Sequence, residues 1–284
     1  MASGKDLKNR IKSITSIKKI TKAMKMVAAS KLRQVQNALE AVRPISGLTT
    51  SVVSEIQNTL LNMETENQSK ESIKKLVIVI SSDRGLCGGI NSSVVKDTRL
   101  NIKSSQKNNE LIELYTIGDK AKDVLVRSHA HHMNTAISET AKRKLSFAIA
   151  SIISEDILKS QFDVCEIVYN QFKSVISQNL VRSQLYSRNN LNKAFFDWNT
   201  YEFDSEKSSV LYDLYEYNLA IAIYNAMLEN ATSEQGARMN AMDSASRNAS
   251  EMIDKLTLTY NKARQAAITS ELIEIISCAS AVAK

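Results

Sequence analysis

The residues best suited to chemistry gather in one glycine-rich loop at positions 81–91. The loop reads Ser-Ser-Asp-Arg-Gly-Leu-Cys-Gly-Gly-Ile-Asn and follows an apolar run. A glycine-rich turn between a strand and a helix can hold a phosphate on the helix N-terminus. However, Gly85, Gly88 and Gly89 match neither the dinucleotide-binding pattern nor the P-loop pattern. We therefore interpret the loop as a turn that approaches another backbone segment, with nucleotide binding as the alternative.

A second candidate is a reactive thiol at Cys87, because a cation such as Arg84 nearby lowers a thiol pKa. No histidine partner is apparent in the sequence around it. Cys87, Cys165 and Cys278 are widely spaced and form no Cys-x-x-Cys pair. We expect all three to be reduced thiols in a reducing compartment.

Two further clusters could in principle bind a metal or exchange protons. His129, His131 and His132 are close in sequence, but adjacent side chains diverge, which favours a surface turn over a metal site. Glu271 and Glu274 share one helix face and favour a solvated or partner-facing stripe. We expect no catalytic residue, no cofactor and no bound metal.

The elements around the loop alternate between strands and helices. Short apolar runs predict strands, and longer segments predict helices. Asn91 or Ser92 can cap the first of these helices. The predicted strands cover residues 76–81, 111–117 and 162–169, with an edge strand at 175–186, and the predicted helices cover 91–105, 118–129 and 142–160. This order predicts parallel pairing with right-handed crossovers in a small Rossmann-like domain.

The sequence predicts a very long helix at each end of the chain. Pro44 is the only proline, and Gly236 is the only glycine after Gly118, so little interrupts the terminal segments. We expect Pro44 to bend or restart the first helix. Apolar or small residues form a seam at helical spacing in each segment, including Ile17, Met24 and Ala28 in the first and Met252, Ala267, Ser270, Ile273 and Ser277 in the second. The seams predict an antiparallel coiled coil.

The fold class is therefore mixed: a long antiparallel coiled coil of terminal helices plus a small Rossmann-like α/β domain. We expect a coiled-coil helix at 1–60, an α/β domain at 73–205, and a second coiled-coil helix at 208–284. The sequence contains no run of about 18 apolar residues that could span a bilayer, and its first residues lack the apolar core of a secretory signal peptide.

Charge concentrates at the start of the chain. Residues 1–36 hold ten basic residues and one acid, a balance of +9, whereas the whole chain has a formal charge of +7. Such a helix could meet nucleic acid, anionic lipid or an acidic protein surface. Charge alone does not distinguish these three kinds of partner.

Three blocks of sequence strongly resemble the gamma subunit family of F-type ATP synthases. They are residues 11–33, with Lys-Ile-Thr-Lys-Ala-Met-Lys-Met-Val-Ala-Ala-Ser-Lys-Leu-Arg at 19–33, the loop at 82–88, and Tyr-Asn-Lys-Ala-Arg-Gln-Ala-Ala-Ile-Thr-Ser-Glu-Leu-Ile-Glu-Ile-Ile at 260–276. They occur in the family's order and together span the chain, although residues 120–205 carry little signature. Cys278 stands where family members usually carry glycine, and the inserted cysteine pair of the chloroplast type is absent.

The resemblance implies a central-stalk rotor that couples proton flow to ATP synthesis or hydrolysis at beta-subunit sites. The implied partners are the alpha and beta subunits, an epsilon- or delta-type stalk subunit and the membrane ring of c subunits, with no nucleic acid. It implies a peripheral protein on the cytoplasmic face of a bacterial plasma membrane, or on the matrix face of the mitochondrial inner membrane. The alternatives are a basic helical nucleic-acid-binding protein and a Rossmann-type nucleotide-binding enzyme.

The resemblance also implies contact residues. The residues implied to contact the beta subunit are Lys22, Met24, Lys25, Arg264, Gln265, Thr269 and Glu271. Met24 is expected to lie near the same contact as Arg264 and Gln265. The family's signature loop corresponds to Asp83, Arg84, Gly85, Cys87 and Gly88.

Overall fold

A computed structural model describes residues 4–64, 73–108, 110–140, 144–187, 202 and 204–282. The chain separates into two compact units. The sheet unit comprises Ala29–Arg238, and the helix-pair unit comprises Met1–Ala28 and Met239–Lys284. The two long helices, α1 (Gly4–Glu64) and α6 (Lys207–Val282), contribute to both units.

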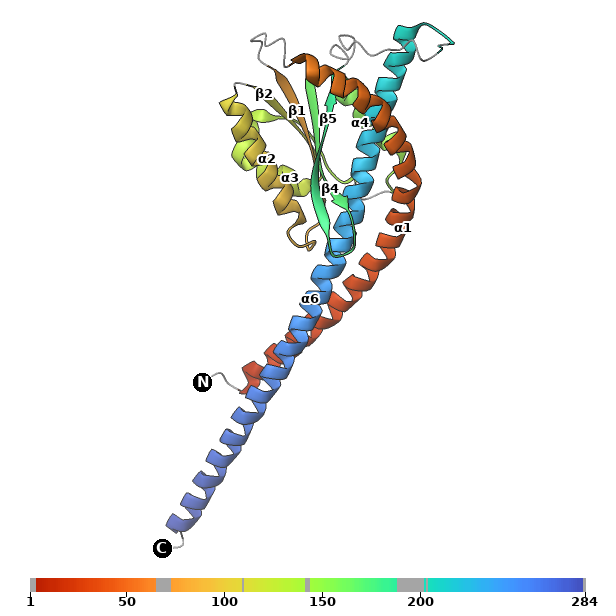
Figure 1. The fold of residues 1–284 in the computed structure, drawn as a ribbon. Helices are drawn as coiled ribbons and strands as arrows, with labels where there is room; N and C mark the ends of the chain where they lie inside the picture. Colours follow the sequence, from red (N-terminus) through yellow and green to blue (C-terminus); the bar gives the residue numbers. More distant parts are fainter. Residues whose placement is uncertain are drawn as a thin grey trace. The chain divides into compact units, whose positions relative to one another are not determined.

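The sheet unit is built on five strands in the order β3-β2-β1-β4-β5 (Figure 1). The strands are β1 (Lys74–Ile80), β2 (Leu111–Ile117), β3 (Met133–Ile137), β4 (Val164–Phe172) and β5 (Gln178–Tyr186). The first four pair in parallel, and β5 lies antiparallel to β4 at the edge. The predicted parallel sheet and its edge strand are confirmed.

The strand β3 and the short 3-10 helix η1 (Ala130–His132) before it were not predicted from the sequence. The strand has five residues, Met-Asn-Thr-Ala-Ile, and none of its side chains is fully buried. It therefore lacks the continuous apolar run that marks β1. Its place at the edge of the sheet explains why a partly polar sequence suffices.

Helices cover both faces of the sheet. One face packs against α2 (Ile90–Lys107) and α3 (Asp119–His129), and the other packs against α4 (Phe147–Leu158) and the first part of α6. Alternate residues of β1 serve the two cores, with Val77 and Val79 toward α2 and α3, and Ile78 and Ile80 toward α4 and α6. Each such fully buried side chain stabilises the fold by about 1.5–3 kcal/mol.

The second part of α1 packs on the sheet unit instead of forming a simple coiled coil. Leu32 and Leu39 join Phe172 of β4 and Leu228 of α6 in one apolar cluster. Pro44 lies inside α1, which continues to Glu64, so the prediction that proline does not end this helix is confirmed. The predicted domain boundaries lie at the ends of the long helices, whereas the boundaries of the two compact units lie inside α1 and α6.

In the helix-pair unit, α1 and α6 run antiparallel, as predicted. The Lys18 Nζ donates to the Ser250 Oγ at 3.0 Å, and the Lys25 Nζ lies 2.5 Å from the Asp243 Oδ1. As residue numbers rise on one helix, those of the partners fall by the same amount. Small or apolar residues are buried between the helices at Leu7, Thr21, Ala28, Met242 and Ala249.

The predicted seam is wrong at two positions of α1. Ile17 and Met24 are 49% and 39% exposed, whereas Lys18 and Lys25 occupy the contact line. The observed line follows a strict alternation of four- and three-residue steps from Leu7 to Ala28, which is the coiled-coil period. On α6, Met252 is 51% exposed, and Ile253 is partly buried in its place.

The pairing stops before the end of α6. Every residue of α6 from 264 to 281, the unpaired end, is exposed. The expected seam residues Ala267, Ser270, Ile273 and Ser277 therefore have no partner within the described chain. The reason is length: in the register of Lys18 with Ser250, Gly4 of α1 already stands opposite residue 264.

No helix among the described residues is both long and apolar enough to cross a membrane.

Candidate functional site

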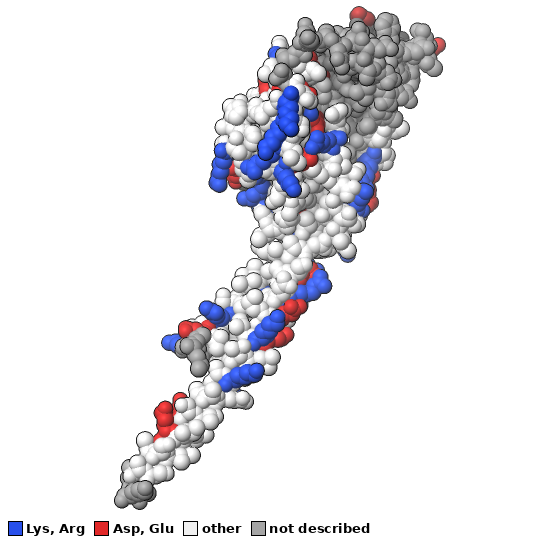
Figure 2. Space-filling model, turned by 60° about the vertical axis from the view of Figure 1, so that its left-hand side comes forward, with Lys and Arg blue, Asp and Glu red and all other residues white. Residues whose placement is uncertain are grey.

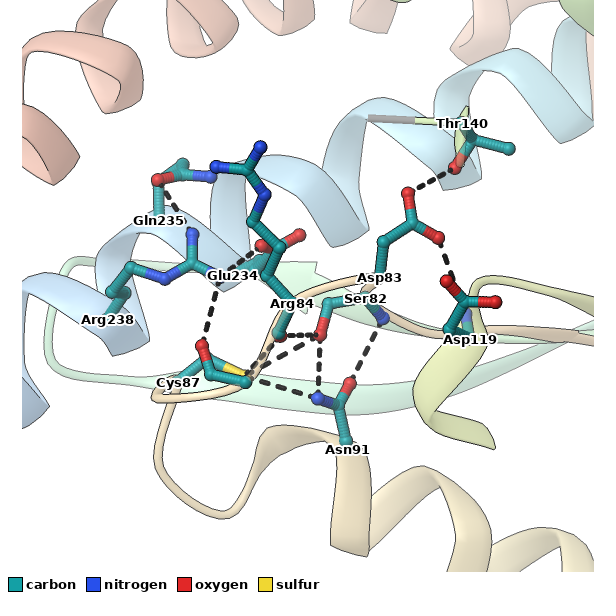
Figure 3. A network of polar contacts seen from close by, with 11 residues as sticks. Ser82, Asp83, Arg84, Cys87, Asn91, Asp119, Thr140, Glu234, Gln235 and Arg238 are labelled. Atoms are coloured by element: carbon teal, nitrogen blue, oxygen red, sulfur yellow. Dashed lines mark hydrogen bonds and ion pairs between the residues drawn. The ribbon is translucent and has the colours of Figure 1, made fainter. Parts of the chain in front are cut away.

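The loop after β1 is held mainly by its own side chains (Figure 3). Asn91 accepts a hydrogen bond from the Ser82 backbone N–H at 3.1 Å and donates to the Ser82 Oγ at 2.6 Å. Asn91 also donates to the Cys87 Sγ at 3.2 Å, and the Ser82 Oγ donates to the Arg84 carbonyl at 2.7 Å. The loop is thus closed into a compact turn before α2 begins.

Asn91 does not cap α2, contrary to the sequence expectation. The N-cap is Gly89, and it makes no side-chain capping bond. The Asn91 amide instead bonds Ser82 and Cys87. The helix α2 begins at Ile90, one residue before the predicted start at residue 91, and has no polar side-chain cap.

The close backbone approach expected in the loop occurs at a different glycine. No heavy atom lies within 4 Å of a Cβ added at Gly88 or Gly89, whereas a Cβ on Gly118 would lie 2.8 Å from the carbonyl carbon of Ser81. Gly118 also has a φ of 102°, a conformation that disfavours other residues. At Gly88, only the positive φ of 65° favours glycine.

Asp83 links the loop to the elements that follow β2. Its Oδ1 accepts from the Asp119 backbone N–H at 3.3 Å, and its Oδ2 accepts from the Thr140 hydroxyl at 3.4 Å. Asp83 therefore orients neighbouring chain segments through polar contacts (Figure 3).

Arg238 of α6 ties the loop to the long helix. Its Nη2 donates to the Gly85 carbonyl at 3.3 Å and to Glu234 at 2.5 Å, and its Nη1 donates to Gln235 at 3.0 Å. Burial raises the pKa of Glu234, and Arg238 opposes that shift. A charge-assisted contact therefore joins the loop backbone to α6 within the sheet unit.

A small cavity lies where β1 and β2 end. Its volume is about 30 Å³, and its polar lining includes Ser81, Ser82, Asp83, Thr140 and Glu234. That volume suits an ordered water, whereas small-molecule sites measure about 300–1,000 Å³. This cavity is too small for a nucleotide.

The thiols of the sheet unit are buried. Cys87 is 2% exposed, and the side chain of Arg84 points away from it (Figure 3). Burial raises the pKa of Cys165 to about 12, with Glu166 adding to the shift. Reactive thiols need a cationic and accessible environment, which neither residue has. Cys278 is exposed, and all three cysteines are free.

The three histidines gather at the end of α3 and in η1. The rings of His131 and His132 are 4.1 Å apart, and those of His129 and His132 are 6.3 Å apart. Among the residues that the structure describes, no group of three potential ligands is arranged to hold a metal.

The candidate contact residues of α1 lie on the helix-pair unit. Lys22 and Met24 are exposed, whereas Lys25 is held by Asp243. Asp243 also pairs with Arg247. The hydrogen bond from Lys25 is the main cause that lowers the Asp243 pKa.

The candidate contact residues of α6 lie on its unpaired end. Arg264, Gln265, Thr269 and Glu271 are all exposed, and the Thr269 hydroxyl donates to the Gln265 carbonyl at 2.8 Å. Large apolar side chains are also uncovered there: Ile268, Leu272, Ile273, Ile275 and Ile276. Their three- and four-residue spacing forms a stripe that a partner could cover.

The structure does not bring Met24 close to Arg264. Because Lys25 stands opposite Asp243, Met24 is level with residue 244, about 30 Å along α6 from Arg264 at 1.5 Å per residue. The candidate residues therefore lie in two separate regions of the helix pair, and the expectation that Met24 lies near Arg264 and Gln265 is wrong.

The anchoring role of three residues of α6 was not predicted from the sequence, which placed Glu234 and Arg238 in the helix seam and left Glu229 out. Glu229, Glu234 and Arg238 are polar residues in a long helix, and Glu229 and Glu234 are 2% and 6% exposed. The available signal was their position on the apolar face of α6, where a carboxylate needs a partner.

Comparison with known proteins gives a consistent match. The family model described as ATP synthase matches residues 3–282. The chain is 42% identical to the mitochondrial ATP synthase subunit gamma of Arabidopsis thaliana, covering 97% of this chain and 84% of that protein. It is 41% identical to the ATP synthase gamma chain of Jannaschia sp., covering 99% of this chain and all of that protein.

Solved structures agree with these relatives. A chain from the central stalk and c-ring of the Tetrahymena thermophila mitochondrial ATP synthase superposes with a TM-score of 0.65 and 30% identity, covering 80% of this chain and 99% of that chain. The signature loop and the paired long helices described above match this assignment. The chain belongs to the gamma-subunit family of ATP synthases.

Proposed function

We propose that this chain is the central-stalk rotor of an F-type ATP synthase, turning inside a head of alpha and beta subunits. The observation that carries the proposal is the unpaired end of α6, residues 264–281. This end has no partner within the described chain, and it exposes an apolar stripe. A surrounding collar of subunits would cover the stripe.

The rotor role follows from asymmetry. A two-helix shaft presents a different side to each of several identical neighbours, so it stabilises a different conformation in each. Rotation then moves these preferences around the head. In this proposal, Arg264, Gln265, Thr269 and Glu271 form one beta-subunit contact, and Lys22, Met24 and Lys25 form a second.

The sheet unit is proposed as the foot, resting on the c-ring beside an epsilon- or delta-type subunit. We place it on the cytoplasmic face of a bacterial plasma membrane, with the mitochondrial matrix face as the alternative. Relatives of both origins share about two fifths of the sequence. The chain carries no catalytic site in this proposal, which is supported by the internal hydrogen bonds that occupy the loop.

Reconstitution tests the proposal. The full chain is mixed with alpha and beta subunits, and the mass and ATPase activity of the assembly are measured. We expect one copy per head and activity that depends on it. A chain that stays out of the assembly, or an assembly equally active without it, would refute the proposal.

A further inference from the structure

A basic cluster lies on the sheet unit, away from the signature loop. It consists of Arg99 and Lys103 of α2, His129 of α3, and His131 and His132 of η1. Figure 2 shows Lys and Arg side chains gathered over this part of the sheet unit, with few acids among them. Within the described part of the chain, none of the five groups lies within ion-pair distance of a carboxylate.

The acid nearest to the cluster along α2, Asp97, is paired with Arg182 at 2.6 Å. Glu110 accepts from the Asn108 amide at 3.4 Å, and Glu113 accepts from the Asn134 amide at 2.9 Å. No ion pair among the described residues therefore neutralises Arg99 or Lys103.

Arg99 supplies the most specific feature. Its Nη2 donates to the Ser128 hydroxyl at 3.2 Å, which fixes the guanidinium between α2 and α3. Its Nε is buried and has no hydrogen-bond partner. A buried donor without an acceptor is costly. Because Nε is closed to solvent, an oxyanion would meet the guanidinium through its terminal nitrogens, which suit a phosphate-type group.

His129 makes the cluster responsive to pH. The charged groups that act on His129 are Arg99 and Lys103 from α2 and His131 and His132 from η1, all of them basic. Burial lowers the pKa of His129 first, and repulsion from these four groups lowers it further. A bound anion would relieve the repulsion and favour protonation.

We propose that this cluster is a binding site for a phosphate-type oxyanion, and that the anion binds more tightly as His129 protonates. The ligand chemistry is a tetrahedral group with two negative charges or a phosphate ester. It can come from a soluble phosphate or from an anionic lipid headgroup. By linkage, anion binding and histidine protonation strengthen each other by the same factor.

The chain offers a direct readout, because His129, His131 and His132 are its only histidines. The full chain, labelled in its histidine rings, is titrated by NMR from pH 5 to pH 8 with inorganic sulfate, whose charge is constant over this range. Chloride keeps the ionic strength fixed. We expect saturable shifts of the ring signals and a raised pKa for His129, with about tenfold tighter binding for each unit of pKa rise.

Variants distinguish a site from general screening. Arg99→Gln should weaken sulfate binding about tenfold or more, since it removes a charge-assisted donor. His131→Gln, at an exposed position, should leave the fold intact and reduce the pH dependence. Lys173→Gln removes one exposed charge elsewhere on the sheet unit and should change neither. Equal weakening by Arg99→Gln and Lys173→Gln, or shifts that never saturate, would overturn the proposal.

Sedimentation with vesicles distinguishes the two sources of the anion, a lipid headgroup and a soluble phosphate. Binding to phosphatidylglycerol vesicles but not phosphatidylcholine vesicles at pH 6, weakened by Arg99→Gln, assigns a lipid headgroup. Saturable sulfate and phosphate binding without vesicle binding assigns a soluble phosphate group.

Discussion

Replacing Arg43 by alanine should loosen the contact that joins α1 to the sheet unit. The Arg43 Nε and Nη2 donate to the two carboxylate oxygens of Glu229 at 2.9 and 3.2 Å, and Nη2 also donates to the Phe172 carbonyl at 2.8 Å. The Glu229 side chain is 3% exposed, whereas that of Arg43 is 43% exposed. The variant would therefore leave a buried carboxylate without its cation.

The expected loss follows from this asymmetry. Removing one partner of a fully buried ion pair costs about 3–5 kcal/mol. Water can reach the exposed Arg43 side, and the Phe172 backbone N–H still donates to Glu229 at 2.8 Å, so the loss should be smaller. We expect about 2 kcal/mol, which corresponds to roughly a thirtyfold change in an equilibrium constant.

The Phe172 amide is a local reporter, because its N–H is bonded to Glu229. Hydrogen exchange of this amide should accelerate roughly thirtyfold in Arg43→Ala when closing outpaces exchange. Arg33→Ala, which removes an exposed arginine from the same helix, should leave the rate unchanged.

A double-mutant cycle makes the reasoning refutable. Glu229→Gln keeps the side-chain shape and an acceptor but removes the buried charge. In that background, Arg43→Ala should cost less than about 1 kcal/mol, because no carboxylate is left unpaired. Strictly additive effects, or equal exchange rates in Arg43→Ala and Arg33→Ala, would show that the ion pair does not hold this contact.

Three further predictions concern other parts of the chain. Gly118→Ala should lower the free energy of unfolding by roughly 3 kcal/mol or more, because of the clash and the positive φ, whereas Gly89→Ala should cost no more than about 1 kcal/mol in urea titrations; similar costs would contradict the geometry. Arg264→Ala should lower the torque and ATPase activity of the assembled head but not the stability of the isolated chain, since Arg264 is exposed; unchanged turnover would count against its contact role. Asp243→Asn should destabilise the helix pair at neutral pH but not at strongly acidic pH. Because the pKa of Asp243 is lowered in the folded chain, its ionised carboxylate contributes stability above the unfolded pKa, and this stability is lost as pH falls. An effect of the variant that does not depend on pH in circular dichroism melts would rule out the ion pair.

The sheet was predictable because its strands follow simple rules. The run Leu111–Ile117 is short, mostly apolar and bounded by Gly118, and the structure places β2 at these residues. The edge strand β3 carries no comparable signal, because its partly exposed positions accept polar residues.

The seam of the helix pair shows where residue type misleads. Met24 is apolar and Lys25 is charged, yet Lys25 lies on the contact line. Asp243 on the other helix pairs with the Lys25 ammonium, so a charged residue is accommodated on this line. The three-and-four spacing counted from Leu7 would have given the observed line.

The central claim is that this chain turns inside a catalytic head, and single-molecule rotation tests it most directly. Cys87 and Cys165 are buried, so a probe can be attached through Lys159→Cys on the sheet unit once Cys278 is replaced by alanine. With the head fixed to a surface, we predict stepwise, one-directional rotation of the probe that starts on addition of ATP. A probe that stays still while the same complexes hydrolyse ATP would contradict the account.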